Sequence, residues 1–177
     1  MIVGLCGYAQ VGKDTIADGL ENYTKHAFAT VLKQEVSAML KQVGLTPELW
    51  GKDKAEWRDM LVFWGAKRRS IDPEYWIKQL FARMCRGMLA GDRMTITDVR
   101  YANEVEWIRK HRGIVIRVTR PGHYPANAEE RKSFDEIDLR FDLPILVNDG
   151  KPEEAVALTR KIISSRVQMP NGYWRAE

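Results

Sequence analysis

The residues with the clearest chemical signature are Gly7 to Thr15, whose sequence is GYAQVGKDT. Two glycines and Lys13 stand at the G-x-x-x-x-G-K spacing of a phosphate-binding loop. Glycines let successive backbone N–H groups turn toward one anion, and a following helix adds the partial positive charge of its N-terminus. Lys13 would bring a full positive charge to the outer phosphates. The stretch therefore predicts phosphate binding, with a glycine-rich turn of some other α/β fold as the alternative.

The residue after this lysine departs from the usual motif, in which Ser or Thr stands there and binds Mg²⁺. This chain has Asp14 instead, and Thr15 follows it. A carboxylate is also a hard oxygen ligand for Mg²⁺, either directly or through water. We therefore predict an altered magnesium site rather than an absent one, with the Thr15 hydroxyl as a donor to an inner phosphate.

A second carboxylate, Asp98, stands near the end of an apolar strand pattern over 93–99. In nucleotide-binding folds of this kind, a carboxylate at such a position holds Mg²⁺ directly or through water. The alternative is a helix cap, because Asp is common where a strand leads into a helix. Arg100 follows two residues later and is expected in the same cleft, although a lone arginine is usually solvated.

Three consecutive cations at 67–69 follow Trp64 and precede a strong helix start, Asp-Pro-Glu at 72–74. The cations suit a clamp for a phosphate monoester, and Trp64 offers a flat face to a base. The alternatives are a solvated helix end for the cations and a core position for Trp64, which stands at helical spacing. Lys33, near the start of its own expected helix, has the same two interpretations.

The segment 119–141 is charged and loses the apolar pattern of its neighbours. One interpretation is a mobile surface loop. A loop this long in a compact domain is often a lid, and a lid that brings arginine over a phosphate serves phosphoryl transfer directly. The transition state of that reaction spreads negative charge over the transferred oxygens, so it needs cations more than a general base. The segment holds Arg120, Arg131, Lys132 and Arg140, and Arg117 stands just before it.

Short apolar strands alternate with helical patterns along most of the chain. Strands are expected over 2–6, 26–29, 93–99, 114–118 and 143–147, and helices after Thr15 and over 30–43, 53–65, 72–91, 103–111 and 152–167. This order predicts a parallel sheet covered on both faces, with a helical insertion between the second and third strands. Ligands bind at the carboxyl ends of such strands, where the glycine loop, Asp98 with Arg100, and Asn148 with Asp149 would all lie. The tail from Met169 is expected to be loosely held.

The 177 residues are 45% hydrophobic and 29% charged, as in an ordinary globular domain with a sizeable core. A net charge of +4 suits anionic ligands but does not by itself indicate nucleic-acid binding. Cys6 and Cys85 form neither a disulfide framework nor a metal-ligand spacing, so we interpret them as buried thiols in a reducing compartment. No run approaches the length of a membrane span, and no signal peptide is apparent, so a cytoplasmic protein is expected.

Several stretches match one family in their order along the chain: Gly7–Thr15, Phe28–Lys33, Trp64–Arg69, Asp72–Trp76, Thr97–Glu104, Arg117–Gly122 and Asn148–Gly150. On these stretches the chain resembles the bacteriophage-type deoxynucleoside monophosphate kinases of the P-loop kinase superfamily. Lys-Asp-Thr in place of Lys-Ser-Thr is itself typical of that group. The resemblance covers most of the chain.

The resemblance implies a P-loop kinase three-layer α/β sandwich with a five-stranded parallel sheet of order 2-3-1-4-5. One domain, 1–177, would comprise a core of 1–29, 93–118 and 143–168, a helical monophosphate-binding insertion over 30–92, and a lid over 119–142. The cofactors would be ATP and Mg²⁺, and a deoxynucleoside monophosphate would be phosphorylated to the diphosphate.

The resemblance also implies a role for each site residue. The ATP phosphates would be held by Gly7, Val11, Gly12, Lys13, Asp14 and Thr15, and Asn148 and Asp149 would lie near the adenine. Asp14 and Asp98 would bind the metal, and the acceptor would meet Lys33, Trp64, Arg68, Arg69 and Arg100. The catalytic residues would be Lys13, Asp98, Arg117 and Arg120, with Arg117 or Arg120 on the transferred phosphate.

The alternative functions are another small-molecule P-loop kinase, resembling dephospho-CoA kinase or phosphomevalonate kinase, and a nucleic-acid-associated P-loop ATPase. The modest charge and the lack of a basic aromatic stripe speak against the ATPase. The expected partner is the monophosphate substrate, with neither nucleic acid nor membrane, and a homodimer stays open. If the chain is phage-encoded, its compartment would be the host cytoplasm.

Overall fold

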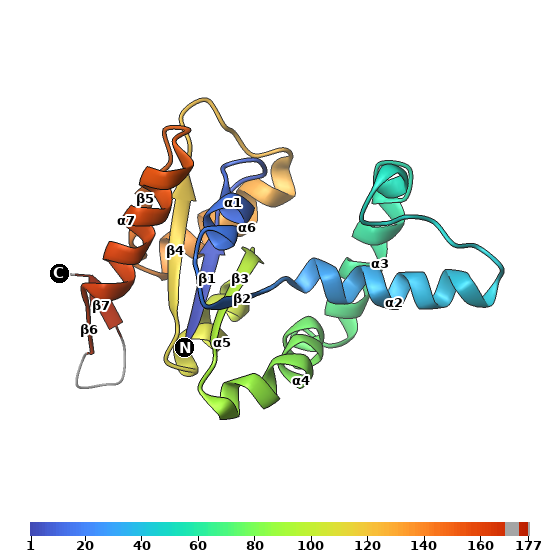
Figure 1. The fold of residues 1–177 in the computed structure, drawn as a ribbon. Coiled ribbons are helices and arrows are strands. Elements are labelled where there is room, and N and C mark those ends of the chain that lie inside the picture. The colour runs from blue at the N-terminus through green and yellow to red at the C-terminus, as the bar shows by residue number, and fades with distance from the viewer. Residues whose placement is uncertain (169–173, 177) are drawn as a thin grey trace. The chain divides into compact units, whose positions relative to one another are not determined.

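The computed structural model describes residues 1–168 and 174–176, and its main sheet is parallel, with the spatial order β2-β3-β1-β4-β5 (Figure 1). The strands of this sheet are β1 (Ile2–Cys6), β2 (Tyr23–His26), β3 (Arg93–Val99), β4 (Ile114–Thr119) and β5 (Ile145–Val147). Every residue of the central strand β1 is buried, as expected where helices cover both faces of a sheet. The predicted parallel sheet and its 2-3-1-4-5 order are confirmed.

The helices of the described chain are α1 (Lys13–Asp18), α2 (Phe28–Gln42), α3 (Arg58–Ile71), α4 (Tyr75–Ala90), α5 (Ala102–Lys110), α6 (Ala128–Arg140) and α7 (Pro152–Ser164). A short 3₁₀ helix covers Lys52–Lys54, and β6 (Arg166–Gln168) pairs antiparallel with β7 (Trp174–Ala176). Within the described ranges, no helix combines the length and the apolar character that crossing a bilayer requires.

The chain divides into two compact units. The first comprises Met1–His26 with Gly87–Glu177 and holds the sheet, and the second is Ala27–Arg86. In the first unit, β1 and β4 present Leu5 and Ile116 to a core that includes Ile16 of α1 and Ala155 of α7. On the opposite face, a Cβ on Gly4 would lie 2.7 Å from Ile108 Cδ1 of α5, so this helix packs directly on the β1 backbone. The first unit is therefore a three-layer sandwich.

The second unit is helical and has a core of its own. Val36 and Leu40 of α2 pack with Leu49 and with Leu61 of α3, and Trp57 and Trp64 among others cover the edge of this cluster. The start of α4 agrees with the predicted cap, because Asp72 Oδ1 accepts a hydrogen bond of 3.0 Å from the backbone N–H of Glu74.

Two boundaries in the chain differ from those predicted. The strand expected over 26–29 is β2, which lies at Tyr23–His26, and α2 begins at Phe28 because Phe28 and Val31 are buried at helical spacing. The helix expected over 53–65 is a 3₁₀ turn followed by α3, which continues past Gly65 to Ile71. Gly65 is buried, and a Cβ there would lie 3.4 Å from a Leu32 methyl, so this glycine serves close packing rather than helix termination.

The expectation of a loop over the whole of 119–141 is wrong, because Ala128–Arg140 form α6. The Asn127 side chain accepts a 2.8 Å hydrogen bond from the backbone N–H of Glu130, and the Glu130 carboxylate accepts one of 2.7 Å from that of Ala126. This reciprocal cap starts the helix, and Phe134 and Ile137 bury its inner face completely.

The C-terminal expectations are met only in part. Helix α7 ends at Ser164 rather than near Val167, because β6 begins at Arg166. The loosely held tail was predicted from Met169, and residues 169–173 and 177 lie outside the described part of the chain. Trp174–Ala176 form β7.

The two cysteines differ in burial. Cys6 is fully buried in β1, and this burial raises the pKa of its thiol to about 12. Cys85 in α4 is only partly buried, and its Sγ lies 3.3 Å from the Ala82 carbonyl oxygen. The predicted buried thiol is therefore confirmed at Cys6, and the prediction for Cys85 is wrong in degree.

Candidate active site at the phosphate loop

The chain passes from β1 into α1 through a loop whose glycines have conformations that other residues rarely adopt. Gly7 has φ 149° and Gly12 has φ 98°. A Cβ on Gly7 would lie only 2.2 Å from the Val118 carbonyl oxygen of the neighbouring strand β4. The loop therefore needs glycine at both positions for its backbone geometry.

Asn148, the first residue after β5, braces this loop. Its Nδ2 donates a 2.8 Å hydrogen bond to the Val11 carbonyl oxygen, and its Oδ1 accepts one of 3.0 Å from the Gly150 N–H. The side chain is buried, and a Cβ on Gly12 would lie 2.3 Å from Nδ2. Asn148 therefore positions the phosphate loop, and its contact with adenine stays a prediction, as does that of exposed Asp149.

Lys13 lies at the first residue of α1, with its ammonium folded into the mouth of the loop. Its Nζ donates hydrogen bonds to the carbonyl oxygens of Gly7 (2.7 Å) and Tyr8 (2.6 Å). Burial, and then the positive charge of Arg100, lower the pKa of Lys13 to about 8. An anion in the loop would favour the charged form of this lysine.

We expect a pH dependence from this lowered pKa. In the ligand-free protein, Lys13 loses its proton as the pH rises through about 8, so phosphate affinity should fall above that pH. Arg100→Gln removes one charge that disfavours the ammonium and should move the Lys13 titration to higher pH. NMR titration of the Lys13 Cε resonance measures this shift, with Arg112→Gln as the control. An unchanged midpoint in Arg100→Gln would contradict the expectation.

Arg100 lies just beyond the carboxyl end of β3, in the same unit as the loop. Its Nη2 is 3.8 Å from Oε1 of Glu130, a buried carboxylate of α6. The Glu104 carboxylate accepts hydrogen bonds from the backbone N–H groups of Arg100 (2.7 Å) and Tyr101 (3.1 Å). Glu104 thereby fills the capping role considered for Asp98, which is half-buried near the end of β3.

Asp14 lies in the first turn of α1 with 76% of its side chain exposed, 3.6 Å from Lys25 Nζ. Magnesium is usually held by one or two carboxylates together with substrate phosphates and water, a set to which Asp14 at the loop can contribute. Among the described residues, no group of three or more His, Cys, Asp or Glu side chains is arranged to hold a metal. The metal roles of Asp14 and Asp98 stay predictions.

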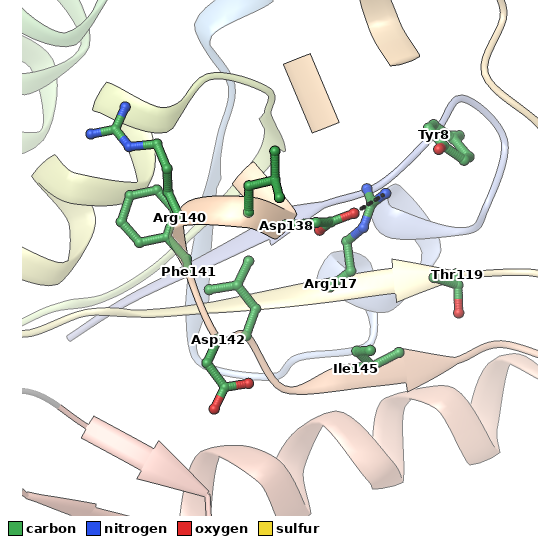
Figure 2. A pocket seen from close by; sticks show the side chains of 10 residues that line it. Tyr8, Arg117, Thr119, Asp138, Arg140, Phe141, Asp142 and Ile145 are labelled. Atoms are coloured by element: carbon green, nitrogen blue, oxygen red, sulfur yellow. Dashed lines mark hydrogen bonds and ion pairs between the residues drawn. The ribbon is translucent and has the colours of Figure 1, made fainter. Parts of the chain in front are cut away.

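Arg117 lies in β4, within the strand expected over 114–118 (Figure 2). Only 7% of its side chain is exposed. Its guanidinium is 5.0 Å from the centre of the Tyr8 ring and 4.2 Å from that of Phe134. Asp138 Oδ2 accepts from its Nη2 at 3.3 Å. We call these four residues the Arg117 clamp. Three of them, Tyr8, Arg117 and Asp138, line one side of a cavity of about 740 Å³ beside β5. The clamp joins α6 to the phosphate loop.

Arg120 follows β4 and lies beside the turn after β5. Its Nη2 is 3.2 Å from the position that a Cβ on Gly150 would take. Arg120 therefore lies near Asn148–Gly150. The family resemblance places Asn148 and Asp149 near the adenine of ATP, whereas it places Arg120 at the transferred phosphate. The contact of Arg120 with a transferred phosphate stays a prediction.

In the second unit, two of the predicted substrate residues gather around Glu35, which sequence reasoning missed. Glu35 Oε1 accepts from Trp64 Nε1 (3.0 Å) and Arg68 Nε (2.7 Å), and Oε2 accepts from the Tyr75 hydroxyl (2.8 Å). The Arg68 guanidinium lies 4.7 Å from both aromatic rings. The sequence signal was an acid on the apolar face of α2, at helical spacing from Leu32.

Two further substrate candidates, Lys33 and Arg69, also belong to this unit. Lys33 Nζ is 5.8 Å from the Trp50 ring, and Arg69 lies beside Gly65. Trp64 also packs against the Val36–Leu61 core, in keeping with the core interpretation of that residue. The Trp64 ring can pack against this core and also stack on a base, so the stacking role stays a prediction.

Glu35→Ala should destabilise the second unit by about 1–3 kcal/mol, because it leaves the donors of Trp64, Arg68 and Tyr75 without their acceptor. Burial alone would raise the pKa of Glu35, but hydrogen bonds from Tyr75, Arg68 and Trp64 outweigh it and hold this pKa below its usual range. The stabilisation is therefore present at neutral pH and lost as the pH falls through this lowered pKa. Urea unfolding of the wild type and of Glu35→Ala, at neutral pH and at a pH below this lowered pKa, measures the difference in free energy of unfolding. Glu48→Ala, at an exposed i,i+4 pair, is the control and should change little.

Two solved structures are similar to this chain in fold. A sugar kinase from Janibacter sp. HTCC2649 is 15% identical, with a TM-score of 0.53, and the match covers 92% of this chain and 94% of that one. A dephospho-CoA kinase from Campylobacter jejuni is 12% identical, again with a TM-score of 0.53, over 92% and 95% of the two chains. No family model and no curated protein sequence matches the chain. At these identities the likeness shows an α/β kinase-like fold.

Proposed function

We propose that the chain is a P-loop kinase that transfers the γ-phosphate of ATP to a deoxynucleoside monophosphate, giving the diphosphate. The observation that carries the kinase part is the glycine loop with Lys13 Nζ held 2.6–2.7 Å from its carbonyl oxygens, at the carboxyl edge of a parallel sheet. The two structures of similar fold are kinases, which supports the same class of reaction. The choice of acceptor rests on the family resemblance of the sequence.

The donor would bind at the phosphate loop. Backbone N–H groups of residues 7–13 and the N-terminus of α1 would face the β- and γ-phosphates, and Lys13 would exchange its loop carbonyl partners for phosphate oxygens. Asp14 and Asp98 would hold Mg²⁺, which neutralises charge on the phosphates when it is bound. The task of these residues is positioning and electrostatic stabilisation.

The acceptor requires cations but no general base. A nucleoside monophosphate has a second pKa of about 6, so its attacking oxygen is already deprotonated at neutral pH. On the family resemblance, Lys33, Arg69 and Arg100 are the proposed contacts of this phosphate. Arg68 is already paired with Glu35, so we propose that it orders Trp64 and Tyr75 around the base.

A dephospho-CoA kinase-like reaction is the second candidate, favoured by the similar fold of a dephospho-CoA kinase. Its acceptor is a hydroxyl, which needs a base to take its proton. A phosphomevalonate kinase-like enzyme and a nucleic-acid-associated ATPase are the remaining alternatives. DNA-stimulated ATP hydrolysis without any small acceptor would favour the ATPase.

The test is a coupled assay of ADP release from Mg²⁺-ATP, with each deoxynucleoside and ribonucleoside monophosphate, dephospho-CoA and phosphomevalonate offered in turn. We expect ADP formation that depends on a deoxynucleoside monophosphate, with the diphosphate as product. Turnover with dephospho-CoA alone would replace the proposed acceptor and keep the kinase class. If none of these acceptors supports ADP formation, the kinase proposal is contradicted.

Trp64→Ala should raise the KM for the monophosphate by about 5- to 150-fold if the indole stacks on the base, since one stack contributes ~1–3 kcal/mol. Trp64→Phe is the matched variant, because it keeps a flat ring and loses only the hydrogen bond to Glu35. We expect its KM to change much less. If KM is unchanged in Trp64→Ala, the stacking role is wrong and Trp64 is a core residue only.

A further inference from the structure

The Arg117 guanidinium is held by residues of two different segments, the phosphate loop and α6. Figure 2 shows its contact with Asp138. The Tyr8 ring lies on the loop side at 5.0 Å, the Phe134 ring at 4.2 Å, and Asp138 Oδ2 at 3.3 Å. Tyr8 and Phe134 also meet edge to face, with ring centres 5.2 Å apart and planes at 81°. Each member of the clamp therefore restrains at least one other member.

The Arg117 side chain is almost fully buried in the described conformation. With 7% of the side chain exposed and two rings packed on it, the guanidinium has little surface to offer a ligand. Asp138 is half-exposed, so solvent weakens its attraction for Arg117. The two rings, of which Phe134 is fully buried, therefore supply much of the restraint.

The clamp reaches the catalytic lysine through the backbone of Tyr8. The Tyr8 carbonyl oxygen accepts a 2.6 Å hydrogen bond from Lys13 Nζ, and the adjacent Gly7 carbonyl accepts the other at 2.7 Å. Gly7 is packed against the Val118 carbonyl of β4, the strand that carries Arg117. A fixed Tyr8 side chain therefore fixes the carbonyls that position the Lys13 ammonium.

We propose that Arg117 is a positioning residue of the phosphate loop, which acts through Tyr8 and not on the transferred phosphate. Helix α6 supplies Phe134 and Asp138 and thereby becomes part of the support of the donor site. The inference deepens the proposed function and rests on it for its catalytic meaning. The order of the loop itself can be measured without turnover.

The test uses Arg117→Met, Tyr8→Leu and the double variant, with Arg109→Met as the matched control. Arg109 also lies over a ring, that of Phe141 at 5.3 Å, and its Nη2 donates a 2.9 Å hydrogen bond to the Asp142 carbonyl oxygen. In the ligand-free proteins, hydrogen exchange of the amides at 7–13 should become at least about tenfold faster in both single variants. Exchange in α5 and β3 should stay unchanged, and Arg109→Met should leave the loop amides at wild-type rates.

The second measurement is the Kd of Mg²⁺-ADP by calorimetry, together with KM for ATP and kcat. We expect Kd and KM for ATP to rise about tenfold in each single variant. The double variant should be little worse than either, because both single variants break the same contact between Arg117 and the Tyr8 ring.

A kcat loss in Arg117→Met with unchanged Kd and unchanged loop exchange would overturn the proposal and indicate a direct catalytic role. Faster exchange spread evenly over the sheet would also overturn it, since it indicates general destabilisation. If the wild type binds no Mg²⁺-ADP, the proposed function fails, and loop exchange alone still decides the positioning role.

Discussion

Lys13→Met is expected to lower kcat for phosphoryl transfer by at least about 100-fold, the loss typical when one preorganised charge-stabilising donor is removed. Methionine has a side chain of similar length, but it cannot donate a hydrogen bond to the γ-phosphate or supply a positive charge opposite it. The fold should survive, because the ammonium is partly buried and its partners are the two loop carbonyls of Gly7 and Tyr8. The substitution therefore separates chemistry from folding.

The measurement is kcat in the coupled assay, with circular dichroism and thermal unfolding on the same protein. Lys110→Met, an exposed lysine in the last turn of α5, is the control and should keep wild-type turnover. Lys13→Met that retained more than a tenth of wild-type activity would place the phosphate site elsewhere. If Lys13→Met loses activity because it unfolds, Lys13→Arg, which keeps the charge, is the second variant to measure.

Gly7→Ala is expected to destabilise the first unit by at least about 2 kcal/mol and to abolish nucleotide binding. At φ 149° an alanine is strained, and its Cβ would lie 2.2 Å from the Val118 carbonyl oxygen. That oxygen belongs to the backbone of β4 and cannot rotate away as a flexible side chain would. Relief requires the loop to leave the strand, which moves the Tyr8 carbonyl and Lys13 with it.

Urea unfolding and Mg²⁺-ADP calorimetry measure these two effects. Gly122→Ala is the matched control, because Gly122 has a positive φ of 76° but nothing lies within 4 Å of its built Cβ. Gly122→Ala should lower the free energy of unfolding by about 1 kcal/mol, the conformational strain alone, and leave nucleotide affinity unchanged. Equal effects of the two substitutions would show that close packing on Val118 contributes nothing.

The phosphate loop shows how much a local sequence pattern can predict. Its conformation depends on residue types at fixed spacing, and the structure has positive φ at both Gly7 and Gly12 and places Lys13 at the start of α1. The apolar runs of β1, β3 and β4 were likewise readable, because central parallel strands are buried on both faces. The strand order came from the family resemblance, and the structure agrees with it.

Helix α6 had a local signal that its high charge concealed. Asn127 and Glu130 stand at capping-box spacing, and Phe134 and Ile137 follow at helical spacing. Charged residues on the outer face made the segment resemble a loop, although a surface helix needs only a narrow apolar stripe. The inner stripe is what packs the helix onto the sandwich and brings Phe134 to Arg117.

The sequence by itself determined the parallel sheet and the glycine loop that leads into α1, because these follow from residue types at short, regular spacing. Only the tertiary structure decided which partner each polar side chain takes. Asn148 bonds to Val11, and Arg117 lies between Tyr8 and Phe134, although these partners are far apart in the chain. Periodicity indicates which face of an element is buried, but the residue opposite depends on how the elements pack.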